Sequence, residues 1–271
     1  GATHAFGSAS ANTVTLRGLA LPRHTLEITT GKSGSVFASG SGHVVAGNAF
    51  GWHANGTPAT GAVSFGISLS GAPLSGIRIG GPDPADRNMI TDRNAALCCE
   101  VGSVGIRALG VNTSSFEGNY FNMDRSGVAV STNGMVGGIS LSGSLASGTP
   151  ASSSNVVRKN VLANINGGPV FTGAGSGNTV TENLMFGHPA NIAGIGFFDI
   201  PSGGTNPQQA PVVTSVTVFG GEVVASGTVT ANSGGMVRLE FFDNPEAFQG
   251  GRAATFVGNM VVNTDASGQG V

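Results

Sequence analysis

The chain has 271 residues, 46 of them glycine, with 10% charged residues and a formal net charge of −2 at pH 7. The small, balanced charge argues against an extended nucleic-acid or anionic-membrane surface, and no run of about 18 apolar residues is present to form a transmembrane helix. With 39% hydrophobic residues and an excess of Gly, Ser, Thr, Asn and Val, the composition favours strands and turns, so we expect an all-β protein.

A repeat marked by asparagine runs through the first two hundred residues. Its copies are segments 43–48, 114–119, 155–160 and 178–183, each of which ends on asparagine. An apolar residue lies three positions before each final asparagine and another lies two positions after it: Val45, Phe50, Phe116, Phe121, Val157, Leu162, Val180 and Met185. Interleaved segments 35–40, 66–71, 105–110 and 138–143 alternate apolar and small or polar residues and end on glycine, as short half-buried strands do.

Short strands of this kind need neighbours. A strand of four or five residues cannot bury its apolar face alone, whereas stacking similar strands about 4.8 Å apart joins their inward residues into one core. Asparagine at one corner of every coil tolerates the left-handed backbone conformation and can pass side-chain hydrogen bonds along the stack as a ladder. The repeat therefore predicts a parallel β-solenoid, and the 23-residue spacing of the last two copies would give about nine coils.

Several segments resemble a known family. Gly76-Ile-Arg-Ile-Gly-Gly81, Asn88-Met-Ile-Thr91 and Gly118-Asn-Tyr-Phe121 with Asp124 are similar to the repeat of bacterial right-handed parallel β-helix proteins, which share the pectate-lyase-like fold. The resemblance covers roughly residues 10–200. It implies a right-handed β-helix in a chain that is secreted or exposed at the cell surface. Asn122-Met-Asp124 stands where the family pattern has Gly-Thr-Asp.

A second unit is expected after a linker. Residues 201–211 are rich in Pro, Gly, Ser and Gln, so we place the β-helix at 1–200, the linker at 201–211 and a small antiparallel sandwich-like domain at 212–271. Its predicted strands are Val212–Phe219, Glu222–Thr230, Met236–Phe242 and Ala254–Thr264, joined by Gly-rich and Asp-Asn-Pro turns. Because the sequence begins at Gly1 and stops within a strand-like pattern, we expect it to be a piece of a larger protein with this domain truncated.

The charged residues are concentrated in one stretch. Residues 78–125 contain 11 of the 26 charged side chains. Aligning the glycine-terminated strands places Arg107 in an outward column with Phe37, Ser68 and Ser140. A single arginine in such a column is compatible with a base that faces a substrate or with a residue that binds a carboxylate. The alternative is that Arg107 pairs with a neighbouring carboxylate on a solvated face. The candidate glycan-binding or catalytic cluster comprises Asp92, Arg93, Arg107, Glu117, Asp124 and Arg125.

The remaining candidate residues carry weaker signals. Trp52 follows the first asparagine corner and could stack on a sugar ring if exposed; the alternative is that it covers the edge of the core. The five histidines have no metal-ligand spacing, and the adjacent Cys98 and Cys99 cannot build a zinc site. We therefore expect no metal or other cofactor, with Ca²⁺ at the Asp83/Asp86 turn as a weaker alternative.

Three functional hypotheses follow. The favoured one is a non-catalytic, extracellular or cell-surface module with a structural, adhesive or glycan-binding role. Because uronate-cleaving members of the resembled family act on the outer face of one sheet, the alternative is a polysaccharide lyase or epimerase that uses Arg107. A hydrolase of the polygalacturonase type is disfavoured, since the sequence has no Asp-Asp pair and no Gly-His-Gly. A third hypothesis is homotypic association through the open ends of an uncapped solenoid.

Overall fold

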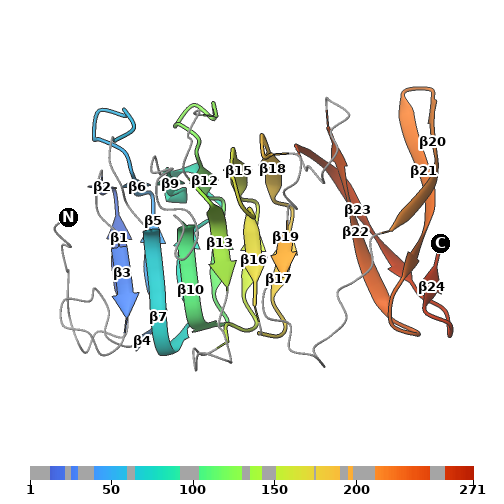
Figure 1. Cartoon of the computed structure of the whole chain (residues 1–271), viewed down its shortest axis with the longest axis horizontal. Helices are drawn as coiled ribbons and strands as arrows, with labels where there is room; N and C mark the ends of the chain where they lie inside the picture. Colours follow the sequence, from blue (N-terminus) through green and yellow to red (C-terminus); the bar gives the residue numbers. More distant parts are fainter. Residues whose placement is uncertain are drawn as a thin grey trace. The chain divides into compact units, whose positions relative to one another are not determined.

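The protein is all-β in a computed structural model, which describes residues 13–21, 26–29, 40–59, 65–91, 104–129, 135–141, 151–173, 175–189, 195–197, 211–244 and 254–271. The chain divides into two compact units, Gly1–Pro201 with Asn244–Thr255, and Ser202–Asp243 with Phe256–Val271. Stacked parallel sheets form the first unit and antiparallel sheets the second (Figure 1). The predicted fold class is thereby confirmed.

Three parallel sheets build the first unit. Sheet 1 contains β1 (Thr15–Arg17), β5 (Val44–Ala46), β8 (Arg78–Gly80), β11 (Ser115–Glu117), β14 (Val156–Arg158) and β17 (Thr179–Thr181). Sheet 2 contains β2 (Ala20–Leu21), β6 (Ala49–Phe50), β9 (Met89–Ile90), β12 (Tyr120–Phe121), β15 (Val161–Ala163) and β18 (Leu184–Phe186). Sheet 3 contains β3 (Leu26–Thr29), β7 (Phe65–Ser75), β10 (Val104–Asn112), β13 (Gly137–Leu141), β16 (Val170–Thr172) and β19 (Ile195–Phe197), and the short β4 (Gly40–Ser41) also pairs with β7. Each coil thus adds one strand to every sheet.

One apolar core runs through the coils. The inward side chains include those that the asparagine repeat predicts: Val45, Phe50, Phe116, Phe121, Val157, Leu162 and Met185 are in the main buried cluster, and Val180 packs against it. Ile67, Ile106, Ile139 and Val170 of sheet 3 belong to the same cluster, each with no exposed surface. The three sheets therefore enclose a continuous hydrophobic interior, as the stacking argument requires.

The predicted asparagine ladder is present and buried. Side-chain Nδ2 atoms donate to the Oδ1 of the next asparagine at 3.1 Å for the first pair and 2.9 Å for the other three. The members are Asn48, Asn88, Asn119, Asn160 and Asn183, and all are at most 2% exposed. Consecutive members are 40, 31, 41 and 23 residues apart. Since only the last coil has the short period, the described residues form six coils, fewer than the nine expected.

At four of the five ladder positions the residue before the asparagine has the left-handed backbone; the exception is Arg87 before Asn88, with φ of −61°. Gly47, Gly118, Lys159 and Glu182 have φ between 54° and 68°. At Gly47 an added Cβ would lie 2.6 Å from the carbonyl oxygen of Ala85, in the short 3₁₀ helix η1 (Pro84–Asp86). Glycine is therefore needed at Gly47 for close approach as well as for φ.

The second unit consists of antiparallel strands. β20 (Val212–Phe219), β21 (Glu222–Thr230) and β24 (Gln269–Gly270) form one sheet, and β22 (Met236–Asp243) pairs with β23 (Thr255–Asn263). β20 and β21 meet at Gly220 and Gly221, whose φ values of 61° and 86° are those of the tight hairpin turns that favour glycine. The four predicted strand ranges agree with the structure to within one residue at each end.

Candidate functional site

The outer face of sheet 3 carries the column that contains Arg107. In the strand register Arg107 is opposite Ser68 on one side and Ser140 on the other, while the adjacent Ile67, Ile106 and Ile139 are paired with one another and fully buried. This confirms the predicted outward and inward columns for these residues. Phe37 lies outside the described residues, and Glu27 of β3 occupies the register position beside Ser68.

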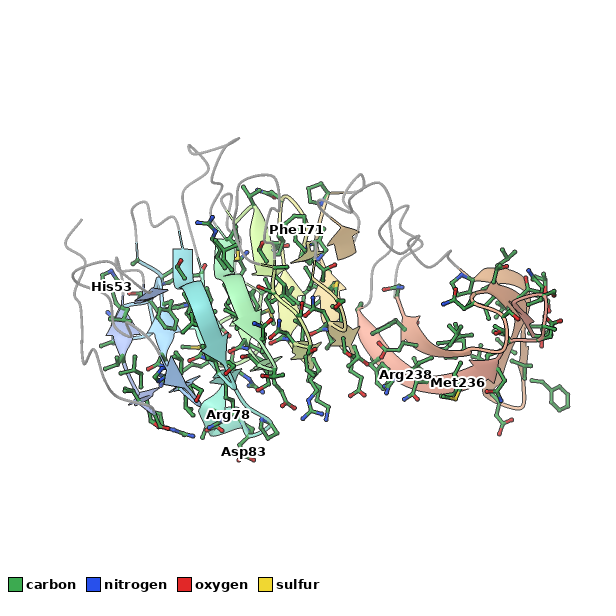
Figure 2. All side chains as sticks on the ribbon, turned by 90° about the horizontal axis from the view of Figure 1, so that it is seen from below. His53, Arg78, Asp83, Phe171, Met236 and Arg238 are labelled. Carbon is green, nitrogen blue, oxygen red and sulfur yellow. The ribbon has the colours of Figure 1, made fainter. Side chains whose placement is uncertain are left out.

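The column continues to Phe171, which the sequence analysis did not identify. Phe171 of β16 is in register with Ser140 and is partly exposed. A Cβ added at Gly137 would lie 3.1 Å from the Phe171 ring, and one added at Gly168 would collide with it. The ring therefore lies directly against the backbone of these two glycines, which fixes its position on the outer face (Figure 2). The sequence signal that could have predicted this site is the presence of glycine at both Gly137 and Gly168, the positions that the outward aromatic ring covers.

The other charged candidates lie elsewhere on the solenoid. Glu117 belongs to β11 of sheet 1, is 4% exposed and forms a two-point ion pair with Arg158, at 2.9 Å from Nε to Oε1 and 3.0 Å from Nη2 to Oε2. Arg125 is exposed in the loop after β12. Asp92 and Arg93 lie outside the described residues. The structure thus places Arg107 in sheet 3, Glu117 in sheet 1 and Arg125 in the loop after β12 of sheet 2.

Asp124 is part of a turn. Its Oδ1 accepts hydrogen bonds from the Ser126 hydroxyl at 2.6 Å, the Ser126 amide at 2.9 Å and the Val128 amide at 3.0 Å. These bonds, led by the one from the hydroxyl, lower the pKa of Asp124. The carboxylate therefore holds the loop, which is its expected role in a turn, and it is satisfied by local donors.

Trp52 is enclosed. It is 2% exposed and packs with Ala49 and Met89, which precede the inward residues Phe50 and Ile90 and so lie on the opposite, outer side of sheet 2. A ring in this position covers the sheet and presents no face to a sugar, which matches the second of the two readings of this residue.

The Asp83/Asp86 turn is a clamp between coils. Asp86 is 7% exposed, and its two oxygens each lie 2.6 Å from a guanidinium nitrogen, of Arg17 in the first coil and of Arg78 in the third. The backbone carbonyl of Asp86 also accepts the amide of Gly47 in the coil between them at 2.9 Å. Both carboxylate oxygens are thus engaged by cations, so a calcium ion at Asp86 would have to displace two arginines.

We expect Asp86→Asn to lower the free energy of unfolding at pH 7 by about 2 kcal/mol, because two arginines lose their ion pairs. Hydrogen bonding from Arg78, more than that from Arg17, lowers the pKa of Asp86. A carboxylate with a lowered native pKa stabilises the fold fully above its unfolded pKa of about 3.9 and loses this contribution as pH falls through the native value. The difference between the two proteins should therefore shrink as pH falls from about 5 to about 2.

Urea unfolding of both proteins across this pH range measures the effect. Asp83→Asn is the matched control, since Asp83 is exposed and makes no cap hydrogen bond, and its effect should stay below about 0.5 kcal/mol. A deficit of Asp86→Asn that is the same at every pH would contradict the ion-pair explanation.

Further observations concern metals, membranes and relatives. Among the described residues, no group of three or more His, Cys, Asp or Glu side chains is placed to hold a metal ion. The part of the chain that the structure describes contains no helix with the length and apolarity of a membrane span.

No protein-family model matches the chain, and a search of curated proteins finds no relative. The family resemblance therefore rests on the repeat and on the stacked parallel sheets.

Proposed function

We propose that the chain is an exported, surface-exposed module of the right-handed, pectate-lyase-like β-helix type that binds an extended anionic glycan without cleaving it. The observation that carries this proposal is the column Ser68, Arg107, Ser140 and Phe171 on the outer face of sheet 3. Its two partly exposed members are a guanidinium and an aromatic ring, which suit a sugar acid as a bidentate carboxylate partner and as a stacking surface.

The geometry of the column suits a polymer. Successive coils lie about 4.8 Å apart, so the four side chains follow the solenoid axis in steps comparable with the size of a sugar ring. Ser68 and Ser140 are only 5% and 7% exposed, whereas Arg107 and Phe171 are partly exposed. Arg107 and Phe171 are therefore the expected contact residues, with one coil between them in the register.

A non-catalytic role is favoured by how the carboxylates are used. Asp86 and Glu117 are held in ion pairs with arginines, and Asp124 accepts three hydrogen bonds within its own turn. None of the three shares a sheet with Arg107. The alternative, a lyase or epimerase acting on a uronate polymer, is supported by the position of Arg107 alone.

Calorimetric titration with oligogalacturonate, alginate oligosaccharides and a sulfated glycosaminoglycan tests the proposal. We expect at least one of these to bind, and Arg107→Ala and Phe171→Ala each to raise its Kd about tenfold, or about 1.4 kcal/mol. Phe171→Tyr keeps the ring and should bind within about threefold of the original protein, which separates stacking from folding.

Two substitutions away from the column serve as controls. Arg125→Ala removes an exposed arginine from the loop after β12, and Phe186→Ala removes a partly exposed phenylalanine from sheet 2. Both should leave glycan affinity unchanged. Equal losses in the controls, or no binding of any of the three polymers, would refute the proposal. A rise in ultraviolet absorbance from unsaturated uronate ends, abolished by Arg107→Ala, would establish the lyase alternative instead.

A further inference from the structure

Two copies of the dipeptide Asn-Gly lie in described parts of the solenoid, Asn55-Gly56 after β6 and Asn166-Gly167 between β15 and β16. A third copy, at residues 133–134, lies outside the described residues. Asn-Gly is prone to spontaneous deamidation, because glycine has no side chain to hinder the attack of its backbone nitrogen on the asparagine side chain. The hydrogen bonds around each copy decide how readily this attack occurs.

The first copy is held by its own turn. The Oδ1 of Asn55 accepts the amide of Thr57 at 3.1 Å and its hydroxyl at 2.7 Å. The backbone amide of Gly56, which is the attacking group, donates to the His53 carbonyl at 3.0 Å. Deamidation of Asn55 therefore requires hydrogen bonds of both reacting groups to break first, and each of these bonds opposes the step.

The second copy has its reacting groups available. Asn166 is exposed, Gly167 is partly exposed, and both lie in a bend. Within the described part of the chain, the hydrogen bond at this dipeptide is made by the Asn166 backbone amide, which donates to the Met135 carbonyl at 2.8 Å. This bond engages neither the side-chain amide of Asn166 nor the Gly167 nitrogen, so the two groups can meet without losing a partner.

Glycine is required at position 167 by the packing of the coils. A Cβ added there would collide with the carbonyl oxygen of Val136, which directly precedes β13 of the neighbouring coil. Exchange of Gly167 for a residue that hinders the attack would therefore disturb the solenoid. The close approach of the two coils thus maintains the residue that makes Asn166 reactive.

We propose that Asn166 is a site of spontaneous deamidation, at which a neutral amide becomes a carboxylate, while Asn55 is protected. The Gly167 nitrogen loses its proton and bonds to the Asn166 Cγ, the Cγ–Nδ2 bond breaks, and ammonia leaves with that proton. Water then opens the resulting succinimide at either carbonyl and gives aspartate or isoaspartate. In sum, water is consumed and ammonia is released, and no group is oxidised or reduced.

The new charge lies near the aromatic end of the column on sheet 3. The Cα atoms of Asn166 and Gly168 are at most about 7 Å apart, and the Phe171 ring lies directly against Gly168. This separation is within about one Debye length at physiological salt. A carboxylate at position 166 therefore repels a sugar acid on Phe171, and deamidation weakens its binding. This consequence, unlike the modification itself, rests on the proposed function.

Peptide mapping by mass spectrometry, during incubation of the full chain at mildly alkaline pH, tests the site. We expect Asn166 to deamidate at least about tenfold faster than Asn55, because the hydrogen bonds that must break at Asn55 add to its barrier. In urea that unfolds the chain, the two rates should converge. Thr57→Val removes a hydroxyl donor and should accelerate deamidation of Asn55 alone, whereas Asn166→Gln, whose longer side chain cyclises poorly, should stay intact.

Two outcomes would overturn the proposal. One is deamidation of Asn166 that is no faster than that of Asn55 in the folded chain. The other is a difference between the two rates that is equally large in urea, because it would then belong to the local sequence and not to the fold.

Calorimetric titration of Asn166→Asp with oligogalacturonate, alginate oligosaccharides and a sulfated glycosaminoglycan tests the consequence. We expect Kd for a glycan that binds to rise about threefold, whereas Asn55→Asp, which adds the same charge in the turn after sheet 2, should leave Kd unchanged. Equal Kd values for the original protein and Asn166→Asp would refute the effect on binding. If none of the glycans binds the original protein, the proposed function fails, and mass spectrometry alone decides the modification.

Discussion

Replacing Asn119 with alanine is expected to lower the free energy of unfolding by about 4 kcal/mol, because one side chain serves two coil boundaries. Asn119 has no exposed surface. Its Nδ2 donates to the Ile79 carbonyl at 3.0 Å and to Asn160 Oδ1 at 2.9 Å, and its Oδ1 accepts from Asn88 at 2.9 Å. Alanine would leave several of these buried groups with fewer partners, and each unsatisfied group costs about 1–3 kcal/mol.

Urea unfolding of the full chain measures this loss, with Asn166→Ala as the matched control. Asn166 is exposed, and the hydrogen bond recorded for it is made by its backbone amide, to Met135, so its loss should stay below about 0.5 kcal/mol. If Asn119→Ala and Asn166→Ala unfold at the same urea concentration, the ladder contributes no net stability, and the coils are held by the apolar core and the backbone hydrogen bonds of the sheets.

The ladder was predictable because its chemistry requires one residue type at one corner. Only a side chain that both donates and accepts can continue a hydrogen-bonded chain from coil to coil, and asparagine does so with its amide close to the backbone. The number of coils was not predictable from the same pattern. Between Asn48 and Asn160 the coils contain loops, so ladder neighbours are 31 to 41 residues apart, and only the last coil has the compact period.

The charged stretch shows why clustering in sequence does not imply a site in a solenoid. Arg78 and Ser115 are register neighbours in sheet 1, so residues 78–114 make up one complete coil of the solenoid. The charged residues of this stretch that the structure describes therefore lie in sheet 1, in sheet 3 and in the segments that connect the sheets. What sequence proximity assembles here is structural, since Asp86 pairs with Arg78 eight positions away. Contacts between coils join distant residues instead: Arg87 lies over the ring of Tyr120 at 3.7 Å.

Alignment of equivalent strands predicted which residues are spatial neighbours better than the clustering of charge along the sequence did. It placed Ser68, Arg107 and Ser140 in one column because residues at the same position of successive coils are neighbours in a parallel sheet. Phe171 belongs to the same column but was not predicted, because its strand β16 (Val170–Thr172) is not among the aligned glycine-terminated segments. For Trp52 the sequence left two alternatives, stacking on a sugar or covering the edge of the core, and the apolar outer residues Ala49 and Met89, which give the ring a surface to cover, favour the second.

A second large effect is expected at Gly80, where alanine should cost about 4 kcal/mol. Its φ of 82° is a conformation that disfavours any Cβ by about 1–2 kcal/mol. The added Cβ would also collide with the Glu117 carbonyl of the next coil and lie 2.6 Å from Asn119 Oδ1, and overpacking of this kind costs a further 1–3 kcal/mol, roughly. Because the obstructing atoms are backbone and ladder, the neighbouring coil would have to shift.

Gly56→Ala isolates the two contributions to this cost. Gly56 has nearly the same φ, 81°, but a Cβ there meets no atom within 4 Å, so only the backbone penalty of about 1–2 kcal/mol remains. Urea unfolding of the two variants should thus differ by about 2 kcal/mol or more, the contribution of close coil stacking. Equal losses would mean that the coils can separate at Gly80 without cost.

The double variant Gly80→Ala/Asn119→Ala links the ladder to the glycine corner. If the Gly80 Cβ acts partly by pushing against the Asn119 amide, removing that amide relieves part of the strain, so the double variant should be more stable than the sum of the single losses implies. We expect the difference to be about 1 kcal/mol, as for residues in direct contact. Strict additivity would instead assign the whole effect of Gly80→Ala to its backbone and to the Glu117 carbonyl. Gly80 and the asparagine ladder would then stabilise the contact between the same two coils independently of each other.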